Sequence, residues 1–196
     1  MASELVSHDN LYVGASVQTA VKILVVGHFG VGKTTFVGNI SEIPPLRTEE
    51  LITQASVGID DLSSTPEKTT TTVAMDFGRL TLSETLVLYL FGTPGQERFK
   101  QLWEDLSLGA LGALVLVDPE RLDESFPVLD LVEQYGLPYA VAVNRFEGAR
   151  SYSMTEIREA LNLSGDTPVV PCDVRDQKSA ADALITLVGH LHSRLD

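Results

Sequence analysis

The chain has 196 residues, a length that suits one domain with its own core. Hydrophobic residues make up 44% and charged residues 21%, an ordinary globular composition that excludes a disordered or collagen-like chain. The formal net charge of −13 argues against general binding to nucleic acid or anionic lipid, because both require a basic surface. The single cysteine, Cys172, excludes an intramolecular disulfide and favours a reducing, cytoplasmic location.

The two ends of the chain carry no recognisable targeting or lipidation signal. Residues 1–18 are polar and aperiodic, so we predict a flexible N-terminal arm followed by one domain over 19–196. The first residues lack the basic and apolar parts of a signal peptide, and no apolar run approaches the length of a membrane span. We therefore expect no direct membrane insertion, and any recruitment to a membrane would require a partner.

The first predicted element is a buried strand that leads into a phosphate-binding loop. Residues 21–26 form an apolar, β-branched run, and a helix is predicted over 33–40. Between them lies the motif G-x-x-x-x-G-K-T, formed by Gly27, His28, Phe29, Gly30, Val31, Gly32, Lys33 and Thr34. In such a P-loop the backbone N–H groups surround a phosphate, the lysine reaches the β and γ phosphates, and the following hydroxyl suits Mg²⁺. The motif predicts binding of a nucleoside triphosphate with Mg²⁺ as cofactor, and Thr35 can bond the α phosphate.

A long polar segment follows the first predicted helix. Residues 41–68 contain three prolines with many Ser, Thr and acidic residues, and they show no clear period. We predict a long loop with little regular structure, and loops of this length are commonly functional. The next two strands, over 73–80 and 85–91, are predicted to form a hairpin.

Strands and helices alternate in the rest of the chain. The remaining strands are predicted over 110–117, 139–143 and 169–170, and the helices over 96–106, 126–135, 154–161 and 176–191. This order predicts a three-layer α/β fold with a mostly parallel six-stranded sheet and helices on both faces. Ligands of such sheets bind at the carboxyl ends of the strands, where the P-loop also lies.

Further segments resemble the motifs of the small Ras-like GTPases. Residues 90–99, Leu-Phe-Gly-Thr-Pro-Gly-Gln-Glu-Arg-Phe, resemble switch II, and Thr72 with the strand after it resembles the switch I threonine and its following strand. Residues 144–147, Asn-Arg-Phe-Glu, are similar to the Asn-Lys-x-Asp guanine motif, and residues 171–173 stand where the family has its short base loop. The resemblance extends from about residue 21 to residue 191 and implies the small G-protein fold of P-loop NTPases. It also implies an extended switch I region over about 41–72.

The resemblance implies a molecular switch that binds GTP and hydrolyses it slowly to GDP and phosphate. Gln96 would be the catalytic residue that orients the attacking water, and Gly95 would bond the γ phosphate. Thr72 would join Thr34 as a metal ligand in the triphosphate state and order the long loop. For the base, the resemblance implies bonds from Asn144 and Glu147, stacking by Arg145, and an O6 contact from the Cys172–Asp173 loop through the Asp173 N–H.

Three features are most similar to the bacterial Ras-like GTPases of the MglA group, and above all to the GTPases of actinobacterial conservon operons. These features are Pro94 in switch II, the extended switch I region and the missing lipid-bearing cysteine. The partners that this resemblance implies are GTP or GDP, a roadblock-type regulatory protein and a sensor-kinase-like protein.

Several positions depart from the family pattern or allow two readings. Gly92 stands where the family has the switch II aspartate that supports Mg²⁺ through water. Asp76 is read as structural, with partial compensation for that loss as the alternative. His28 is read as a surface residue rather than a catalytic one, Phe29 as a packing residue, and Asp118 as a cap of the next turn.

Two questions stay open at this point. Arg47, Lys68 and Arg79 either supply a positive charge to the transition state or are solvated loop cations. The chain is either a switch that hydrolyses GTP or a GTP/GDP-binding module with negligible hydrolysis, because Gly92 removes a metal-supporting group. A kinase-like phosphotransferase is a further alternative, although no arginine-rich lid is recognisable in the sequence.

Overall fold

The computed structural model describes residues 15–44, 46–52, 71–93, 100–146 and 148–194. Its strands are β1 (Thr19–Val26), β2 (Leu46–Ile52), β3 (Thr71–Thr81), β4 (Leu86–Gly92), β5 (Ala110–Val117), β6 (Tyr139–Asn144) and β7 (Val169–Cys172). Its helices are α1 (Lys33–Ile40), α2 (Lys100–Ser107), the 3-10 turn η4 (Leu122–Ser125), α3 (Phe126–Gln134), α4 (Met154–Ala160) and α5 (Gln177–Ser193).

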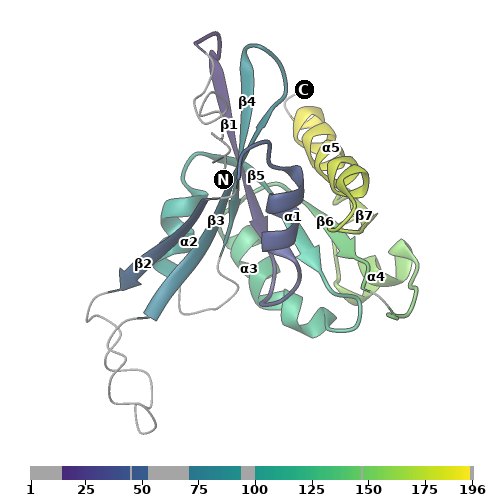
Figure 1. Ribbon diagram of the computed structural model, residues 1–196. Coiled ribbons are helices and arrows are strands. Elements are labelled where there is room, and N and C mark those ends of the chain that lie inside the picture. Colours follow the sequence, from purple (N-terminus) through teal and green to yellow (C-terminus); the bar gives the residue numbers. More distant parts are fainter. Residues whose placement is uncertain (1–14, 45, 53–70, 94–99, 147, 195–196) are drawn as a thin grey trace, which may run out of the picture.

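A single twisted sheet forms the centre of the molecule (Figure 1). Its seven strands follow the order β2-β3-β4-β1-β5-β6-β7. Neighbouring strands from β4 to β7 are parallel, whereas β3 is antiparallel to both β2 and β4. This arrangement confirms the predicted α/β class with a mostly parallel sheet, and β2 adds one strand to the six that were expected.

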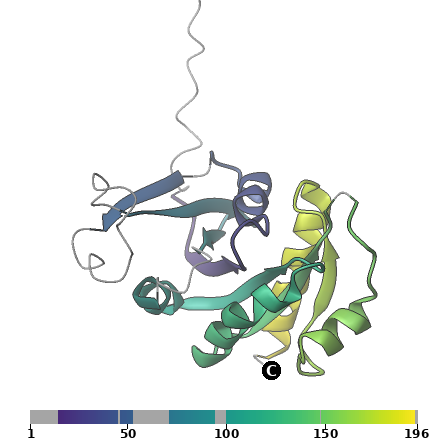
Figure 2. The same ribbon diagram turned by 90° about the horizontal axis from the view of Figure 1, so that it is seen from below.

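Helices cover both faces of the sheet, as Figure 2 shows. One core cluster packs the sheet against α1 and α5 and includes Phe36 and Leu187. The second packs the opposite face against α2, α3 and α4 and includes Trp103, Val132 and Ile157. Every residue of β6 is buried, because a parallel strand covered on both faces leaves no side for solvent.

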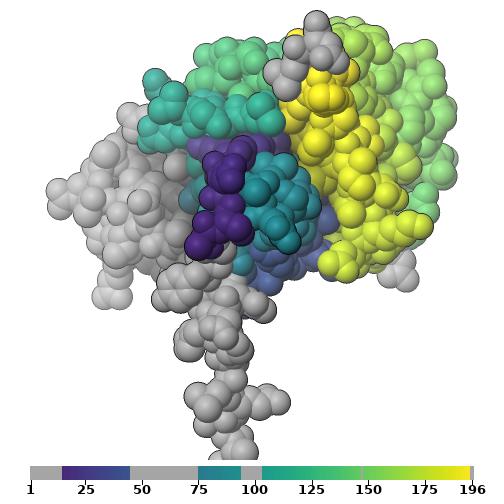
Figure 3. All heavy atoms as spheres, turned by 90° about the horizontal axis from the view of Figure 1, so that it is seen from above, coloured from purple at the N-terminus to yellow at the C-terminus, as the bar shows by residue number. Residues whose placement is uncertain are grey.

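The described start of the chain lies beside the β3–β4 hairpin (Figure 3). The N–H groups of Gln18 and Thr19 both donate to Thr85 O at 2.9 Å. Most of the predicted N-terminal arm lies outside the described residues. None of the helices in the described ranges is long and apolar enough to cross a membrane.

Local signals explain where two of the helices begin. Ser153 and Glu156 form a reciprocal capping box at the start of α4, and the side chain of Asp176 accepts from Lys178 N at the start of α5. Leu184 of α5 is buried against the sheet, whereas Val188, one turn later, is 39% exposed. The predicted start of the second helix, at residue 96, lies outside the described residues.

β2 corrects the prediction that residues 41–68 contain little regular structure. It pairs antiparallel with β3 in a register from Leu46 opposite Phe77 to Ile52 opposite Thr71. β2 is an edge strand, where charged residues are common and the alternation of a half-buried strand is weak. Backbone pairing with β3 forms the strand, and this pairing leaves no clear pattern in the sequence.

Candidate functional site

The P-loop connects the end of β1 to the start of α1. Gly27 has φ of +147°, and a Cβ there would lie 2.5 Å from the backbone oxygen of Leu116. Gly32 has φ of +108°, and a Cβ there would lie 3.0 Å from both Asn144 Nδ2 and a methyl group of Val174. Larger residues would disrupt the loop at both positions, because φ is left-handed and space is absent.

Lys33, at the C-terminal side of the P-loop, bonds back to the first residues of the loop. Its ammonium donates to Gly27 O at 2.7 Å and to His28 O at 2.8 Å. Burial lowers the pKa of Lys33 to about 8, and the nearby Asp76 carboxylate offsets part of that lowering. The loop therefore holds a partly buried cation whose charge is available at neutral pH.

Thr34 contacts an acidic residue from a different element. Its hydroxyl donates to Asp76 Oδ2 at 2.5 Å, and Asp76 is only 8% exposed. Asp76 lies on β3 directly opposite Gly92 of β4, and a Cβ at Gly92 would lie 3.1 Å from Asp76 Cβ. The register of β3 and β4 thus places the Asp76 carboxylate of β3 beside Thr34. This carboxylate lies next to Gly92 of β4, the position at which the Ras-like GTPases have an aspartate.

His28 and Phe29 have the opposite exposures to those predicted. His28 is 3% exposed, and its Nδ1 lies 2.8 Å from Phe29 O and 3.3 Å from a carboxylate oxygen of Glu124. Phe29 is 75% exposed. The loop turns the imidazole of His28 towards η4 and the phenyl ring of Phe29 towards solvent. The prediction was based on side-chain polarity, which does not determine the direction in which the loop turns each side chain.

Asn144, at the end of β6, joins two loops. Its Nδ2 donates to Val31 O at 2.9 Å, and its Oδ1 accepts from Val174 N at 3.3 Å. The contact of Asn144 with the edge of the base stays a prediction; in the structure Asn144 is 2% exposed, and the oxygen and the nitrogen of its amide each bond a protein group. It therefore holds the P-loop against the segment after β7.

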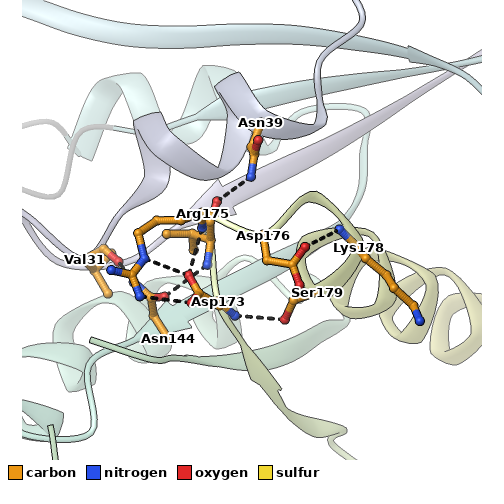
Figure 4. Close-up of polar contacts among 9 residues, drawn as sticks. Val31, Asn39, Asn144, Asp173, Arg175, Asp176, Lys178 and Ser179 are labelled. Atoms are coloured by element: carbon orange, nitrogen blue, oxygen red, sulfur yellow. Dashed lines mark hydrogen bonds and ion pairs between the residues drawn. The ribbon is translucent and has the colours of Figure 1, made fainter. Parts of the chain in front are cut away.

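The predicted base loop, residues 171–173, leads into a turn at Val174 and Arg175, and we call residues 172–175 together the base loop (Figure 4). Asp173 N donates to Ser179 Oγ at 2.9 Å, so this N–H group faces α5 rather than standing free for a base. The Asp173 carboxylate pairs with the Arg175 guanidinium through two contacts of 3.0 Å. Hydrogen bonds from Arg175 lower the pKa of Asp173. Cys172 is buried, and burial raises the pKa of its thiol to about 12, which agrees with a packing role rather than a nucleophilic one.

A cavity of about 480 Å³ adjoins the base loop. Its lining includes Arg145, Phe146, Arg150 and Arg175. The Asp173 carboxylate neutralises one of the three guanidinium groups, that of Arg175, and the groups of Arg145 and Arg150 add positive charge on a molecule with a net charge of −13. Such a cavity is suited to a planar or anionic group, because guanidinium groups stack on rings and pair with anions.

Two other cations near the expected site each pair with a carboxylate. Arg79 is 6% exposed and pairs with Glu42 at 2.7 Å, so its charge is not presented to the P-loop. Arg121 pairs with Asp118 at 2.9 Å, and one of its nitrogens lies 4.0 Å from a Cβ built at Gly30. Asp118 also accepts from Glu120 N at 3.0 Å, as expected of a turn cap.

Several predicted residues lie outside what the structure describes. Gly95, Gln96, Glu147 and Lys68 fall in undescribed segments. Thr72 and Arg47 lie on the paired strands β3 and β2, and only the backbone is described at these two positions. The described residues that the sequence analysis missed include Val174, which lies in the base loop, and Asn39, which bonds it; neither carries a motif signal of its own.

Known proteins similar to this chain include one archaeal relative and two solved G domains. The "Uncharacterized protein MJ1339" of Methanocaldococcus jannaschii is 32% identical over 127 residues, which cover 64% of this chain and 70% of that protein. The crystal structure of the G domain of the T. maritima FeoB iron transporter has a TM-score of 0.61 at 16% identity, covering 88% of this chain and 99% of that one. The FeoB G-domain from Methanococcus jannaschii has a TM-score of 0.59 at 12% identity, covering 89% and 99%.

The two solved structures establish the fold alone, which is that of a P-loop G domain. The family comparison covers most of the chain, from the end of β1 to the last turn of α5. Over residues 25–194 the sequence matches the model of one family, so the chain belongs to the family described as "Conserved hypothetical ATP binding protein".

Proposed function

We propose that this protein is a GTP-binding molecular switch with slow GTP hydrolysis. The main support is the connection that Asn144 makes between the P-loop, at Val31 O, and the base loop, at Val174 N. This connection brings a phosphate-binding loop and a candidate base-binding loop to one end of the parallel sheet. A nucleoside triphosphate is the class of ligand that needs both loops.

The choice of guanine rests on residues 144–147. The description of the family refers to ATP, whereas the Asn-Arg-Phe-Glu pattern resembles the guanine motif, and a carboxylate there would face the wrong donors on adenine. Displacement of a fluorescent nucleotide from the purified protein by GDP or ADP tests the assignment. We expect GDP to bind at least tenfold more tightly, and tighter binding of ADP would overturn it.

Thr34 and Asp76 are the described residues that fit a Mg²⁺ site. Both offer oxygen atoms, the ligand type that Mg²⁺ prefers, and they meet from two different elements. We propose that Thr34 binds the metal directly and that Asp76 supports it, as the alternative reading of Asp76 allowed. Thr72 remains the proposed second ligand. The metal would neutralise charge on the phosphates, while Lys33 and the loop N–H groups hold them.

Hydrolysis is proposed to depend on Gln96, which would orient the attacking water. Single-turnover hydrolysis of GTP by Gln96→Leu tests this role. We expect the rate to fall by at least tenfold with GTP affinity unchanged, while Gln134→Leu, at the exposed end of α3, keeps the wild-type rate. An unchanged rate in Gln96→Leu would instead favour the alternative function, a GTP/GDP-binding module with negligible hydrolysis.

The finer assignment to the MglA group, and to the conservon GTPases within it, is also a proposal. It implies a roadblock-type regulator and a sensor-kinase-like partner, both of which would contact the switch segments. Titration of the protein loaded with GDP or with a non-hydrolysable GTP analogue against a purified roadblock-type protein tests it. We expect affinity to depend on the nucleotide, and equal affinity for both states would contradict a switch.

A further inference from the structure

Val174, in the base loop, is held on both sides of its backbone. Its N–H donates to Asn144 Oδ1 at 3.3 Å, and its carbonyl accepts from Asn39 Nδ2 at 3.0 Å. Its side chain is 4% exposed. Asn39 lies in the last turn of α1, the helix that begins in the P-loop, and Figure 4 shows it reaching the base loop from the side of that helix.

These contacts form a closed ring through the candidate site. Asn144 bonds Val31 in the P-loop, Val31 leads along the chain through α1 to Asn39, and Asn39 bonds Val174, which returns to Asn144. Two of the three hydrogen bonds belong to Asn144, which the motif analysis already identified. The third is made by Asn39 and is the link between α1 and the base loop.

The Asn39 bond acts on the orientation of one peptide unit. The carbonyl of Val174 and the N–H of Arg175 belong to the same planar trans peptide, so fixing the carbonyl towards α1 directs the N–H to the opposite side. The N–H groups of Asp173 and Val174 already bond Ser179 and Asn144. The N–H of Arg175 donates at 3.0 Å to Asp173 Oδ1, which belongs to a partly exposed carboxylate of the same loop, so a ligand oxygen would have to displace this carboxylate to accept from that N–H.

We propose that Asn39 is a positioning residue that orients the base loop through Val174 and thereby sets how long a guanine nucleotide stays bound. This inference rests on the proposed function. It differs from the direct contacts of the P-loop and the guanine motif, because Asn39 acts through a backbone carbonyl. Loss of the bond should weaken contacts to the base and leave contacts to the phosphates intact.

The test measures dissociation of fluorescent GDP, chased with excess unlabelled GDP, in Asn39→Ala and in Asn39→Asp. The aspartate is nearly isosteric but cannot donate to the carbonyl. We expect both variants to release GDP about 3- to 10-fold faster than the wild type, the range that follows from losing one hydrogen bond. Their affinity for tripolyphosphate, which has no base, should stay within about twofold of the wild type, because the P-loop contacts are retained.

Thr186→Val is a matched control, since it removes a hydroxyl bond to the carbonyl of Asp182 within α5 and away from the base loop. It should release GDP at the wild-type rate. Nucleotide-free Asn39 variants should unfold within about 4 °C of the wild type. An equal loss of GDP and tripolyphosphate binding would indicate general damage and overturn the inference.

The inference and the proposed function fail in different ways. Unchanged GDP release in both Asn39 variants, with GDP bound by the wild type, would overturn the role of Asn39 alone. Absence of GDP binding by the wild type would overturn the proposed function, and the inference with it.

Discussion

At the scale of single residues, Lys33 makes nucleotide binding sensitive to pH. Burial lowers the pKa of Lys33 to about 8 in the protein described here, and bound phosphate would raise it again by attraction. Binding is therefore coupled to protonation of Lys33. The ammonium is present below the lowered pKa and is lost as the pH rises through it, so affinity should be highest below about pH 8.

The expected result is a fall in GDP affinity of up to about tenfold between pH 8 and about pH 9, the limit for loss of one proton per site. Equilibrium titrations at about pH 7, 8 and 9 measure it. Lys33→Met should bind weakly and with little dependence on pH. An affinity of the wild type that stays flat over this range would contradict the coupling.

Asp76 and Gly92 permit a second prediction at the residue scale. Asp76→Ala should reduce the Mg²⁺-dependent part of GDP affinity by about tenfold, the usual effect of losing a group that supports a metal ligand. Gly92→Asp alone should also weaken binding, because its Cβ would lie 3.1 Å from Asp76 Cβ and a second carboxylate would crowd the first.

The double variant Asp76→Gly/Gly92→Asp exchanges the carboxylate between β3 and β4. It should recover part of the Mg²⁺ dependence, because positions 76 and 92 are direct partners on the neighbouring strands β3 and β4. GDP affinity measured with Mg²⁺ and with EDTA separates the metal-dependent part. Full Mg²⁺ dependence in Asp76→Ala would show that Asp76 has no role at the metal.

At the scale of secondary-structure elements, the packing of α5 on β5 depends on a glycine. A Cβ at Gly112 would lie 2.7 Å from Pro138 O and 2.7 Å from a methyl group of Leu191. Because a backbone oxygen cannot move aside easily, Gly112→Ala should lower the free energy of unfolding by about 1–3 kcal/mol. Urea denaturation measures the change.

Gly189 provides the matched control for Gly112. It lies within α5, and a Cβ there would have nothing within 4 Å. Gly189→Ala should raise the free energy of unfolding by about 0.5–1 kcal/mol, because alanine favours a helix interior. Similar changes in the free energy of unfolding of the two variants would mean that the close contacts at Gly112 do not determine which residue that position tolerates.

At the scale of the whole molecule, the net charge of −13 should make stability depend on salt. Like charges repel more in the compact state than in the unfolded chain, and added salt screens them. Between about 0.01 M and about 0.15 M salt the screening length falls from about 30 Å to about 8 Å. We expect Tm to rise by about 2–4 °C over this range.

Thermal unfolding in NaCl and in KCl of equal ionic strength measures the effect. Equal rises in the two salts would identify screening, since screening depends on ionic strength rather than on the identity of the ion. A Tm that falls with added salt would indicate that ion pairs such as Arg79–Glu42 outweigh the general repulsion.

Features that depend on neighbours in the sequence were predictable. The apolar run at 21–26, the P-loop and the alternating strands and helices predicted the sheet and the position of the phosphate loop, because periodicity and glycine spacing are local. β2 was not predictable in the same way, because an edge strand formed by backbone pairing shows little of its structure in its side chains.

Within the candidate site, the sequence by itself determined the P-loop, its lysine and hydroxyl, and the polar residues at the ends of the strands. Only the tertiary structure decided which of them meet. The β3–β4 register brings Asp76 to Thr34, and the packing of α1 brings Asn39 to Val174. The tertiary structure also decided that His28 is buried and that Phe29 is exposed. The physical reason is distance along the chain: contacts between residues 42 or 135 positions apart arise from strand pairing and helix packing, which no local pattern records.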